Sequence, residues 1–190
     1  MKNAIVATIL SGIIAIACSN DTAHEVSRMQ GKQIVMPAEL HYYHGNLPEY
    51  NTADDALATL LIWYDSTQCS GCRLNNLMDL DIFERYCRDT LGYVNVDIVF
   101  SPPTDAHEVF EEMVEQARVR YPIYVDYYGL FAAQNKYLPK SEQLHTFLLD
   151  AESKVVLVGD PTRGIAMWNL YKKYMVMLCN NNGLLPKAAN

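Results

Sequence analysis

Apolar residues gather in short runs along the chain. One run, from Thr59 to Tyr64, predicts a strand that is buried on both faces of a sheet. A second run, from Tyr93 to Phe100, predicts the next strand. Further on, His145 to Leu149 and Lys154 to Val158 flank a turn at residues 150–153, which predicts a β-hairpin. These runs supply the strands of one sheet.

Between the strands, apolar residues recur at three- and four-residue intervals, as one face of a helix requires. Residues 74–87 predict one kinked helix or two short ones, with Asp81 and Glu84 placed as a capping pair. Thr104 or Asp105 can cap a second helix, and residues 130–137 predict a third. A terminal helix presents one apolar stripe, formed by Met167, Leu170, Tyr171, Tyr174, Met175 and Leu178.

Two stretches before the first long strand have weaker patterns. Lys32 to Met36 predicts a short strand closed by Pro37, whereas His41 to Asn51 is rich in Tyr, Gly, Pro and Asn and predicts a loop. The order of the main elements is strand, helix, strand, helix, hairpin and helix. This order predicts an α/β fold with a mixed sheet, a parallel crossover between the first two long strands, and helices on both faces.

The composition fits one globular domain. Half of the 190 residues are hydrophobic, which is enough apolar material for one core. The formal charge is -7, and the sequence has no dense cluster of Lys and Arg. Nucleic acid is therefore not an expected partner, because affinity for phosphate depends on grouped basic residues.

The first residues have the pattern of an export signal. A basic start at Met1 to Asn3 precedes an apolar run from Ala4 to Ala17, which is shorter than the roughly 20 residues of a membrane-spanning helix. The run ends at Cys18, and Ala15-Ile16-Ala17-Cys18 resembles a bacterial lipobox, in which the cysteine carries the lipid. Ordinary cleavage near Ala17 is the alternative.

This interpretation divides the chain into three parts. Residues 1–17 are the lipoprotein signal peptide, residues 18–30 are a flexible tether without fixed structure, and residues 31–190 are the folded domain. We expect the lipid on Cys18 to anchor the domain to a membrane of the bacterial cell envelope, where it is periplasmic or surface-exposed. Disulfides persist outside the cytosol, so export allows the remaining cysteines to be redox-active.

The clearest chemical motif is the pair Cys69 and Cys72, which follows the strand ending at Tyr64 and opens the next helix. Unpaired N–H groups at the start of a helix stabilise a thiolate, so Cys69 is expected to attack. Cys72 lies one turn further on the same face, where it can resolve a mixed disulfide. The pattern therefore predicts dithiol–disulfide exchange.

A zinc site and a passive disulfide are the other interpretations of this pair. Zinc needs two more ligands at a suitable spacing, which neither Cys87 nor Cys179 provides, so we expect no metal and no cofactor. Cys87 and Cys179 lie on apolar helix faces, where we expect buried bystanders or a structural pair. His41 and His44 have the spacing of metal ligands but stand in the predicted loop without a third ligand, so we expect surface histidines.

The segment from Leu60 to Arg73, with the CxxC pair in it, resembles the active-site segment of the thioredoxin-like superfamily, especially its exported thiol–disulfide oxidoreductases and peroxiredoxin relatives. The stretch from His145 to Gly159 resembles the hairpin that follows the active site in that group. The whole chain resembles a group of uncharacterised bacterial thioredoxin-like lipoproteins. The resemblance implies a thioredoxin-like three-layer α/β/α fold with a mixed central sheet. It also implies exported protein thiols or disulfides, and an upstream redox partner, as the partners.

Two positions depart from the superfamily pattern. Where the superfamily has a cis-proline before the hairpin strand, this chain has Leu144, and Pro139 stands five residues too early. Leu144 and its neighbour His145 are therefore the candidate substrate contacts. Gln68 stands where many members have an aromatic residue. The resemblance thus implies thiol exchange with an altered docking region.

Three other functions compete with thiol exchange. A peroxiredoxin-like peroxidase is expected to have a hydroxyl residue three positions before its cysteine and a proline seven before it. Ser66 meets the first condition and Ile62 fails the second. Copper delivery calls for a histidine beside the thiolates, for which His145 is the candidate. The third is a non-catalytic binding module whose CxxC pair is simply disulfide-bonded, and the leucine at position 144 supports it.

Overall fold

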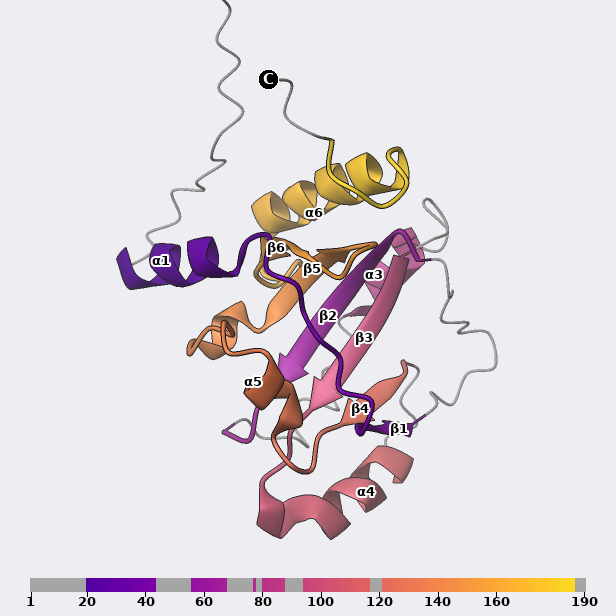
Figure 1. Cartoon of the computed structure of the whole chain (residues 1–190). Helices are drawn as coiled ribbons and strands as arrows, with labels where there is room; N and C mark the ends of the chain where they lie inside the picture. The colour runs from indigo at the N-terminus through magenta and orange to yellow at the C-terminus, as the bar shows by residue number, and fades with distance from the viewer. Residues whose placement is uncertain are drawn as a thin grey trace, which may run out of the picture.

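The computed structural model describes residues 20–43, 56–67, 77, 80–87, 94–116 and 121–186 (Figure 1). The predicted signal peptide, Cys18, and the pair Cys69 and Cys72 lie outside these ranges. Within them, the chain forms one mixed sheet with helices on both faces. No helix in these ranges is long and apolar enough to cross a membrane.

Six strands form the sheet, in the order β1-β4-β3-β2-β5-β6. Strands β2, β3 and β4 run parallel, whereas β1 pairs with β4, β5 with β2, and β6 with β5 in the antiparallel sense. The sheet is therefore mixed, and the predicted parallel crossover between β2 and β3 is confirmed. The strands are β1 (His41–Tyr43), β2 (Ala58–Tyr64), β3 (Val94–Phe100), β4 (Ile123–Val125), β5 (Thr146–Asp150) and β6 (Val155–Val158).

Helices pack against the sheet, and the terminal helix is the longest of those described. Its predicted apolar stripe is confirmed, because Tyr171, Met175 and Leu178 are fully buried. The helices are α1 (Asn20–Met29), α3 (Asp81–Tyr86), α4 (His107–Gln116), α5 (Leu130–Gln134) and α6 (Ile165–Cys179), with 3-10 turns η3 (Thr104–Ala106) and η4 (Glu142–Leu144).

Successive residues of a strand point to opposite faces of a sheet, and β2 follows this rule. Leu60 and Ile62 join a buried cluster with residues of α4 and α6, on what we call the α6 face. Leu61 and Trp63 join a second cluster with Met29 of α1 and residues of α5, on what we call the α5 face. The fold therefore has three layers, a central sheet between two helical layers, as predicted.

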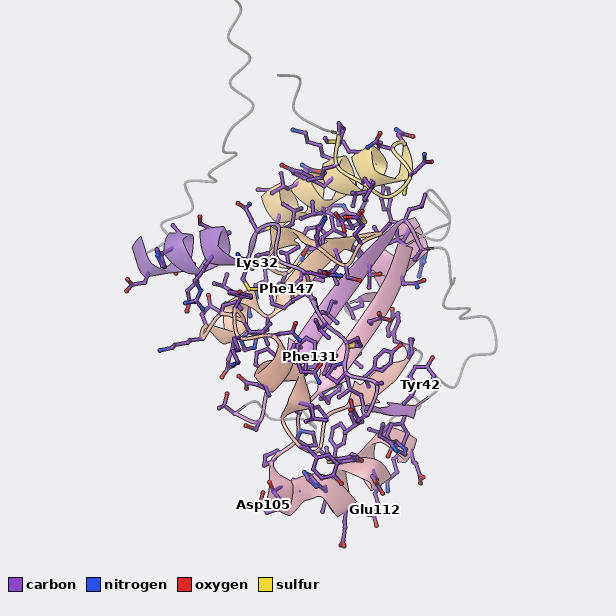
Figure 2. The ribbon with its side chains drawn as sticks, in the orientation of Figure 1. Lys32, Tyr42, Asp105, Glu112, Phe131 and Phe147 are labelled. Atoms are coloured by element: carbon purple, nitrogen blue, oxygen red, sulfur yellow. The ribbon has the colours of Figure 1, made fainter. Side chains whose placement is uncertain are left out.

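The α5 face lies toward the viewer in Figure 2, where Phe131 of α5 and Phe147 of β5 are labelled. Both side chains are fully buried in the cluster on this face. The predicted hairpin forms within one residue of its expected bounds, since β5 ends at Asp150 and β6 begins at Val155. Asp150 stabilises the turn, because its Oδ1 accepts a hydrogen bond from the backbone N–H of Lys154 at 2.9 Å.

The segment that follows the predicted lipid site has fixed structure. Residues Asn20–Met29 form α1, and Met29 is fully buried on the α5 face. Gly31 then adopts φ +72, a left-handed conformation that glycine accepts without steric cost, and its N–H donates to the Val155 carbonyl at 2.8 Å. The expectation that residues 20–29 lack fixed structure is therefore wrong, because Met29 and the bond to β6 hold this segment against the domain.

The structure also corrects two predictions, the strand expected before Pro37 and the loop expected after it. The strand expected from Lys32 to Met36 is reduced to one isolated bridge, between Gln33 and Lys154. The loop expected from His41 onward begins instead with β1, whose residues pair with β4 at one edge of the sheet. Pairing with a neighbouring strand outweighs the loop-like composition of this stretch.

Two helices have different ends from those predicted. Neither Thr104 nor Asp105 caps α4, because both lie within η3 and α4 begins only at His107. The helix expected over residues 130–137 ends at Gln134, since the next residue leaves helical geometry with φ -111 and ψ 63. Helix ends depend on local tertiary contacts more than helix centres do.

Cys87 and Cys179 do not form a disulfide with each other. Cys87 is buried on the α6 face, where its Sγ lies 3.7 Å from the sulfur of Met175. Cys179 is half-buried at the end of α6, and this burial raises the pKa of its thiol. The alternative of a structural pair is therefore wrong, and both residues act as small apolar side chains.

Candidate active site at the end of the central strands

The carboxyl ends of the parallel strands β2 and β3 meet at one edge of the sheet, where their arrowheads lie side by side in Figure 1. Tyr64, the last residue of β2, pairs with Phe100, the last residue of β3. Loops at such strand ends carry functional side chains in many α/β proteins. The chain leaves β2 through residues 65–67, and Cys69 follows two residues later in the sequence. This edge is therefore the candidate active site.

Asp65 organises the turn that leaves β2. Its Oδ1 accepts hydrogen bonds from the Thr67 backbone N–H at 3.0 Å and from the Thr67 hydroxyl at 2.6 Å. The Thr67 hydroxyl also lies 3.0 Å from Oε1 of Glu142, in η4. A hydroxyl has one proton and donates to one acceptor at a time. Two acidic side chains thus converge on the hydroxyl of Thr67, which stands two positions before Cys69 in the sequence.

His145 lies beside Asp65 and is only 3% exposed. Its Nε2 is 2.9 Å from the Pro139 carbonyl oxygen, which can only accept, so Nε2 carries a proton and donates it. The other ring nitrogen, Nδ1, is 3.8 Å from Oδ2 of Asp65. A buried histidine therefore presents its second nitrogen to a carboxylate.

Trp63 packs its ring against that of His145, with 4.3 Å between ring centroids and 34° between ring planes. Its indole N–H donates to the Ser101 hydroxyl at 3.1 Å, and this hydroxyl lies 3.4 Å from Oδ2 of Asp126. The backbone N–H of Trp63 also donates to the His145 carbonyl at 2.9 Å. These contacts fix the position of the His145 ring relative to the end of β2.

Asp126 follows β4 and is buried, with 2% of its surface exposed. Its carboxylate accepts the backbone N–H groups of Tyr128, Leu130 and Phe131 at 3.3, 2.9 and 2.8 Å. The first N–H groups of a helix have no partner within the helix, so a carboxylate at this place satisfies them and is itself satisfied. Asp126 thus stabilises the start of α5, whose Phe131 packs against Trp63.

The two predicted substrate contacts are both described and both buried. Leu144 ends η4 and is 7% exposed within the cluster of the α5 face. His145 is the next residue and precedes β5. The described residues contain no cis peptide bond, so the peptide at Leu144 is trans. A contact between these residues and a substrate stays a prediction.

Two candidate metal sites were weighed from the sequence: the cysteine pair, and His41 with His44. In the part of the chain that the structure describes, no three side chains of His, Cys, Asp or Glu gather as a metal site. His41 is exposed and packs against Tyr43, with 4.7 Å between ring centroids, whereas His44 lies outside the described residues. Copper delivery depends on the cysteine pair and stays an untested alternative.

Another acid, the half-buried Asp97, lies away from this edge, within β3. Asp97 pairs in register with Leu61 of β2, so its side chain points to the α5 face. Burial raises the pKa of Asp97 from its usual 3.8 to about 6. Burial and the charge of Asp97 together also raise the pKa of the Tyr124 phenol. An ionised Asp97 is therefore costly to the folded state near neutral pH.

Sequence reasoning identified His145 but missed its neighbours. Asp65 and Thr67 had a signal, because an acid and a hydroxyl residue two positions apart are typical of a side-chain-stabilised turn. Glu142 had no signal in the sequence, since it stands 75 residues after Thr67 and only the fold brings the two residues together. The predicted sites Cys18, Cys69 and Cys72 lie outside the described residues.

No family model matches the chain, and no curated protein matches it. Solved structures do match. The chain is similar to thioredoxin-like proteins. One of them, a thioredoxin-like protein solved in its oxidised form, is 15% identical, with 80% of this chain and 97% of that chain covered and a TM-score of 0.48.

Two further similar structures carry more specific names. A putative thiol:disulfide interchange protein DsbE from Chlorobium tepidum is 14% identical, with 77% of this chain and 98% of that chain covered and a TM-score of 0.47. A putative protein disulfide isomerase from Bacteroides thetaiotaomicron is 12% identical, with 80% of this chain and 90% of that chain covered and a TM-score of 0.46. The predicted α/β fold, with a mixed central sheet between two helical layers, is confirmed by the structure itself. A shared fold does not define a substrate.

Proposed function

We propose that this protein is a membrane-anchored thiol–disulfide oxidoreductase that uses Cys69 and Cys72 on exported protein substrates. One observation carries the proposal: β2 ends at Tyr64 on the edge where the parallel strands finish, and Cys69 follows Tyr64 by five positions in the sequence. A CxxC pair after such a strand is typical of a redox site. The similar structures that bear thiol–disulfide names agree with this choice but do not decide it.

The proposed reaction needs no cofactor. The Cys69 thiolate attacks a sulfur of the substrate disulfide, and the other substrate sulfur leaves as a thiolate that takes up a proton. The Cys72 thiolate then attacks the Cys69 sulfur of the mixed disulfide and releases the second substrate thiol. Two electrons pass to the substrate, and the chain is left with a Cys69–Cys72 disulfide that an upstream dithiol partner reduces. Run in reverse, the same steps oxidise a substrate dithiol.

Leu144 and His145 are the proposed substrate contacts, on the segment that precedes β5. Their side chains are buried, so we expect a substrate to meet the backbone here more than the side chains. This arrangement differs from the proline that the superfamily has at this place.

The decisive experiment uses the chain without residues 1–18 and the variant Cys72→Ser. We expect this variant to accumulate mixed disulfides with envelope proteins, because its Cys69 can attack but nothing resolves the product. The double variant Cys69→Ser/Cys72→Ser is the matched control and traps nothing. If Cys72→Ser also traps nothing, and thiol reductants barely open the wild-type disulfide, the chain is a binding module and the proposal is wrong.

Anchoring is tested separately on the full-length chain. We propose that Cys18 carries the lipid, so the wild type incorporates labelled fatty acid and partitions into detergent, whereas Cys18→Ser does neither. Ordinary cleavage near Ala17 predicts instead an unlabelled protein in both cases. The two experiments are independent, since removal of the anchor leaves the cysteine pair intact.

A further inference from the structure

We propose that a basic patch beside α1 binds the anionic headgroups of a lipid bilayer and orients the domain on the membrane. The patch consists of Arg28, Lys32, Lys136, Tyr137 and Lys140. The partner is a bilayer surface that contains anionic phospholipid. The choice of this partner rests on the anchoring part of the proposed function, because a lipid on the chain brings the domain to a bilayer.

The basic patch combines the end of α1 with the segment that follows α5. Nη2 of Arg28, in the last turn of α1, lies 3.5 Å from the carbonyl oxygen of Tyr137. Nζ of Lys32 lies 4.7 Å from the centre of the Tyr137 ring. The backbone N–H of Lys140 donates to Oε1 of Glu25 in α1 at 3.0 Å. The fold therefore brings basic side chains from two distant segments to one surface.

The charges of the basic patch face solvent. All four of its basic side chains are exposed, and Tyr137 is 49% exposed. Over residues 20–36 and 135–140, four basic side chains stand against two acidic ones, Asp21 and Glu25. This part of the surface is thus net positive, although the whole chain has a formal charge of -7. Each Lys or Arg close to an anionic membrane raises affinity roughly fivefold.

The apolar side of α1 is already covered by the domain. Met29 is fully buried, and Val26 packs against the same cluster on the α5 face. A helix that lies within a membrane interface turns its apolar side toward the lipid. Since α1 has its apolar side against the sheet, its contact with a bilayer is electrostatic. Salt weakens contacts of this kind between exposed charges.

The charges at the α4 end of the molecule have the opposite sign. The exposed acids of η3 and α4 are Asp105, Glu108, Glu111, Glu112 and Glu115. Figure 2 labels Lys32 in the upper half of the molecule, close to α1, and Asp105 and Glu112 at the bottom. An anionic surface attracts the first region and repels the second. The basic patch therefore orients the domain with α4 away from the membrane.

The position of α1 in the sequence favours a membrane over a soluble acidic partner. Cys18, the proposed lipid site, stands two positions before Asn20, where α1 begins. Two residues of chain span at most about 7 Å, and a helix of ten residues is about 15 Å long. The proposed lipid thus keeps the basic patch within reach of the bilayer surface.

The test uses the chain from Ser19 onward, which retains the whole described fold and carries no lipid. Its binding is measured by co-sedimentation with vesicles of phosphatidylcholine alone or of phosphatidylcholine and phosphatidylglycerol in equal amounts. We expect binding to the anionic vesicles at low ionic strength and little binding to the neutral ones. The binding should be lost in about 1 M NaCl, where charges are screened beyond about 3 Å.

Paired substitutions locate the binding surface. Lys136→Gln/Lys140→Gln is expected to lower partitioning into anionic vesicles roughly 25-fold, whereas Lys136→Arg/Lys140→Arg keeps it. The matched control, Lys172→Gln/Lys173→Gln, removes the same charge from α6 on the other face of the sheet and should change partitioning far less. Circular dichroism verifies that each variant is folded. The inference is overturned if anionic vesicles bind no better than neutral ones, or if the control loses as much binding as Lys136→Gln/Lys140→Gln.

This test and the tests of the proposed function fail separately, because the vesicle assay uses neither the lipid nor the cysteine pair. If Cys72→Ser traps no partner but the vesicles bind as expected, the thiol–disulfide function fails and the basic patch stands. If the wild type takes up no fatty acid but the vesicles bind, the lipid anchor is wrong and the patch still contacts the membrane. If labelling and trapping succeed but the vesicles do not bind, the proposed function stands and the role of the patch is wrong.

Discussion

The two faces of the sheet differ in the polar side chains that they carry. On the α6 face the cluster is apolar, and the phenol of Tyr171 is satisfied by the Gly159 carbonyl at 2.6 Å. On the α5 face, Asn135 and His145 are buried beside the cluster, and Asp97 points into the same side of the sheet. Buried polar groups cost free energy unless they are paired. The comparison indicates that the α6 face is a scaffold, whereas the α5 face carries polar side chains, with His145 at the strand ends and Asp97 within β3.

The first prediction removes apolar volume from the α6 face. Leu178→Ala is expected to lower the free energy of unfolding by about 2–5 kcal/mol, because the fully buried side chain leaves a cavity. The pH profile of Cys69 alkylation should not change, since the helix only supports the sheet. Denaturant unfolding and alkylation of the same samples measure both effects. Val176→Ala, an exposed position on α6, is the control, and a shifted profile in Leu178→Ala would contradict the division between the faces.

The second prediction concerns Asp97 on the α5 face. Its folded pKa of about 6 lies above its usual value, so the unfolded chain loses this proton first as the pH rises from 3.8 to 6. Stability is therefore fully present below pH 3.8 and falls across this window, by about 3 kcal/mol in total.

Asp97→Asn tests that account, because it removes the titration. The variant should be more stable than the parent at pH 7 and should lose the part of the pH dependence that lies between 3.8 and 6. Unfolding by denaturant at pH 4 and pH 7 measures the difference. Asp105→Asn, at an exposed site labelled in Figure 2, should leave the pH dependence as it is. If the free energy of unfolding changes with pH in the same way in the parent and in Asp97→Asn, the raised pKa of Asp97 does not cause the loss of stability.

The third prediction concerns the attachment of the N-terminal segment to the α5 face. Asn135 accepts the Val35 N–H and donates to the Val35 carbonyl, both at 2.8 Å, and it also donates to the Phe131 carbonyl. Asn135→Ala leaves these backbone groups without that partner and should cost about 1–3 kcal/mol. Hydrogen exchange should show faster exchange of the Val35 amide. Gln134→Ala, at the exposed last position of α5 just before Asn135, should not have this effect.

The local sequence predicted the long strands well, but it predicted the ends of the helices and the segment of α1 poorly. The apolar run of β2 and the hairpin of β5 and β6 formed within one residue of the expected bounds, because a continuous apolar stretch has few places other than a buried sheet. The helix α1 was missed, because its polar composition resembles that of a tether, although Met29 and Val26 pack on the α5 face. These tertiary contacts outweighed the polar pattern of ten residues.

The sequence by itself determined the order of the main strands and helices from β2 to α6, the mixed sheet, and the position of the cysteine pair after β2. Alternation of apolar and polar residues and turn chemistry are local properties that can be read along the chain. Only the tertiary structure decided that Glu142 meets Thr67 and that His145 faces Asp65, with Trp63 against its ring. The reason is physical: antiparallel pairing of β2 with β5 brings these distant segments together, and no local pattern records which polar side chains then meet.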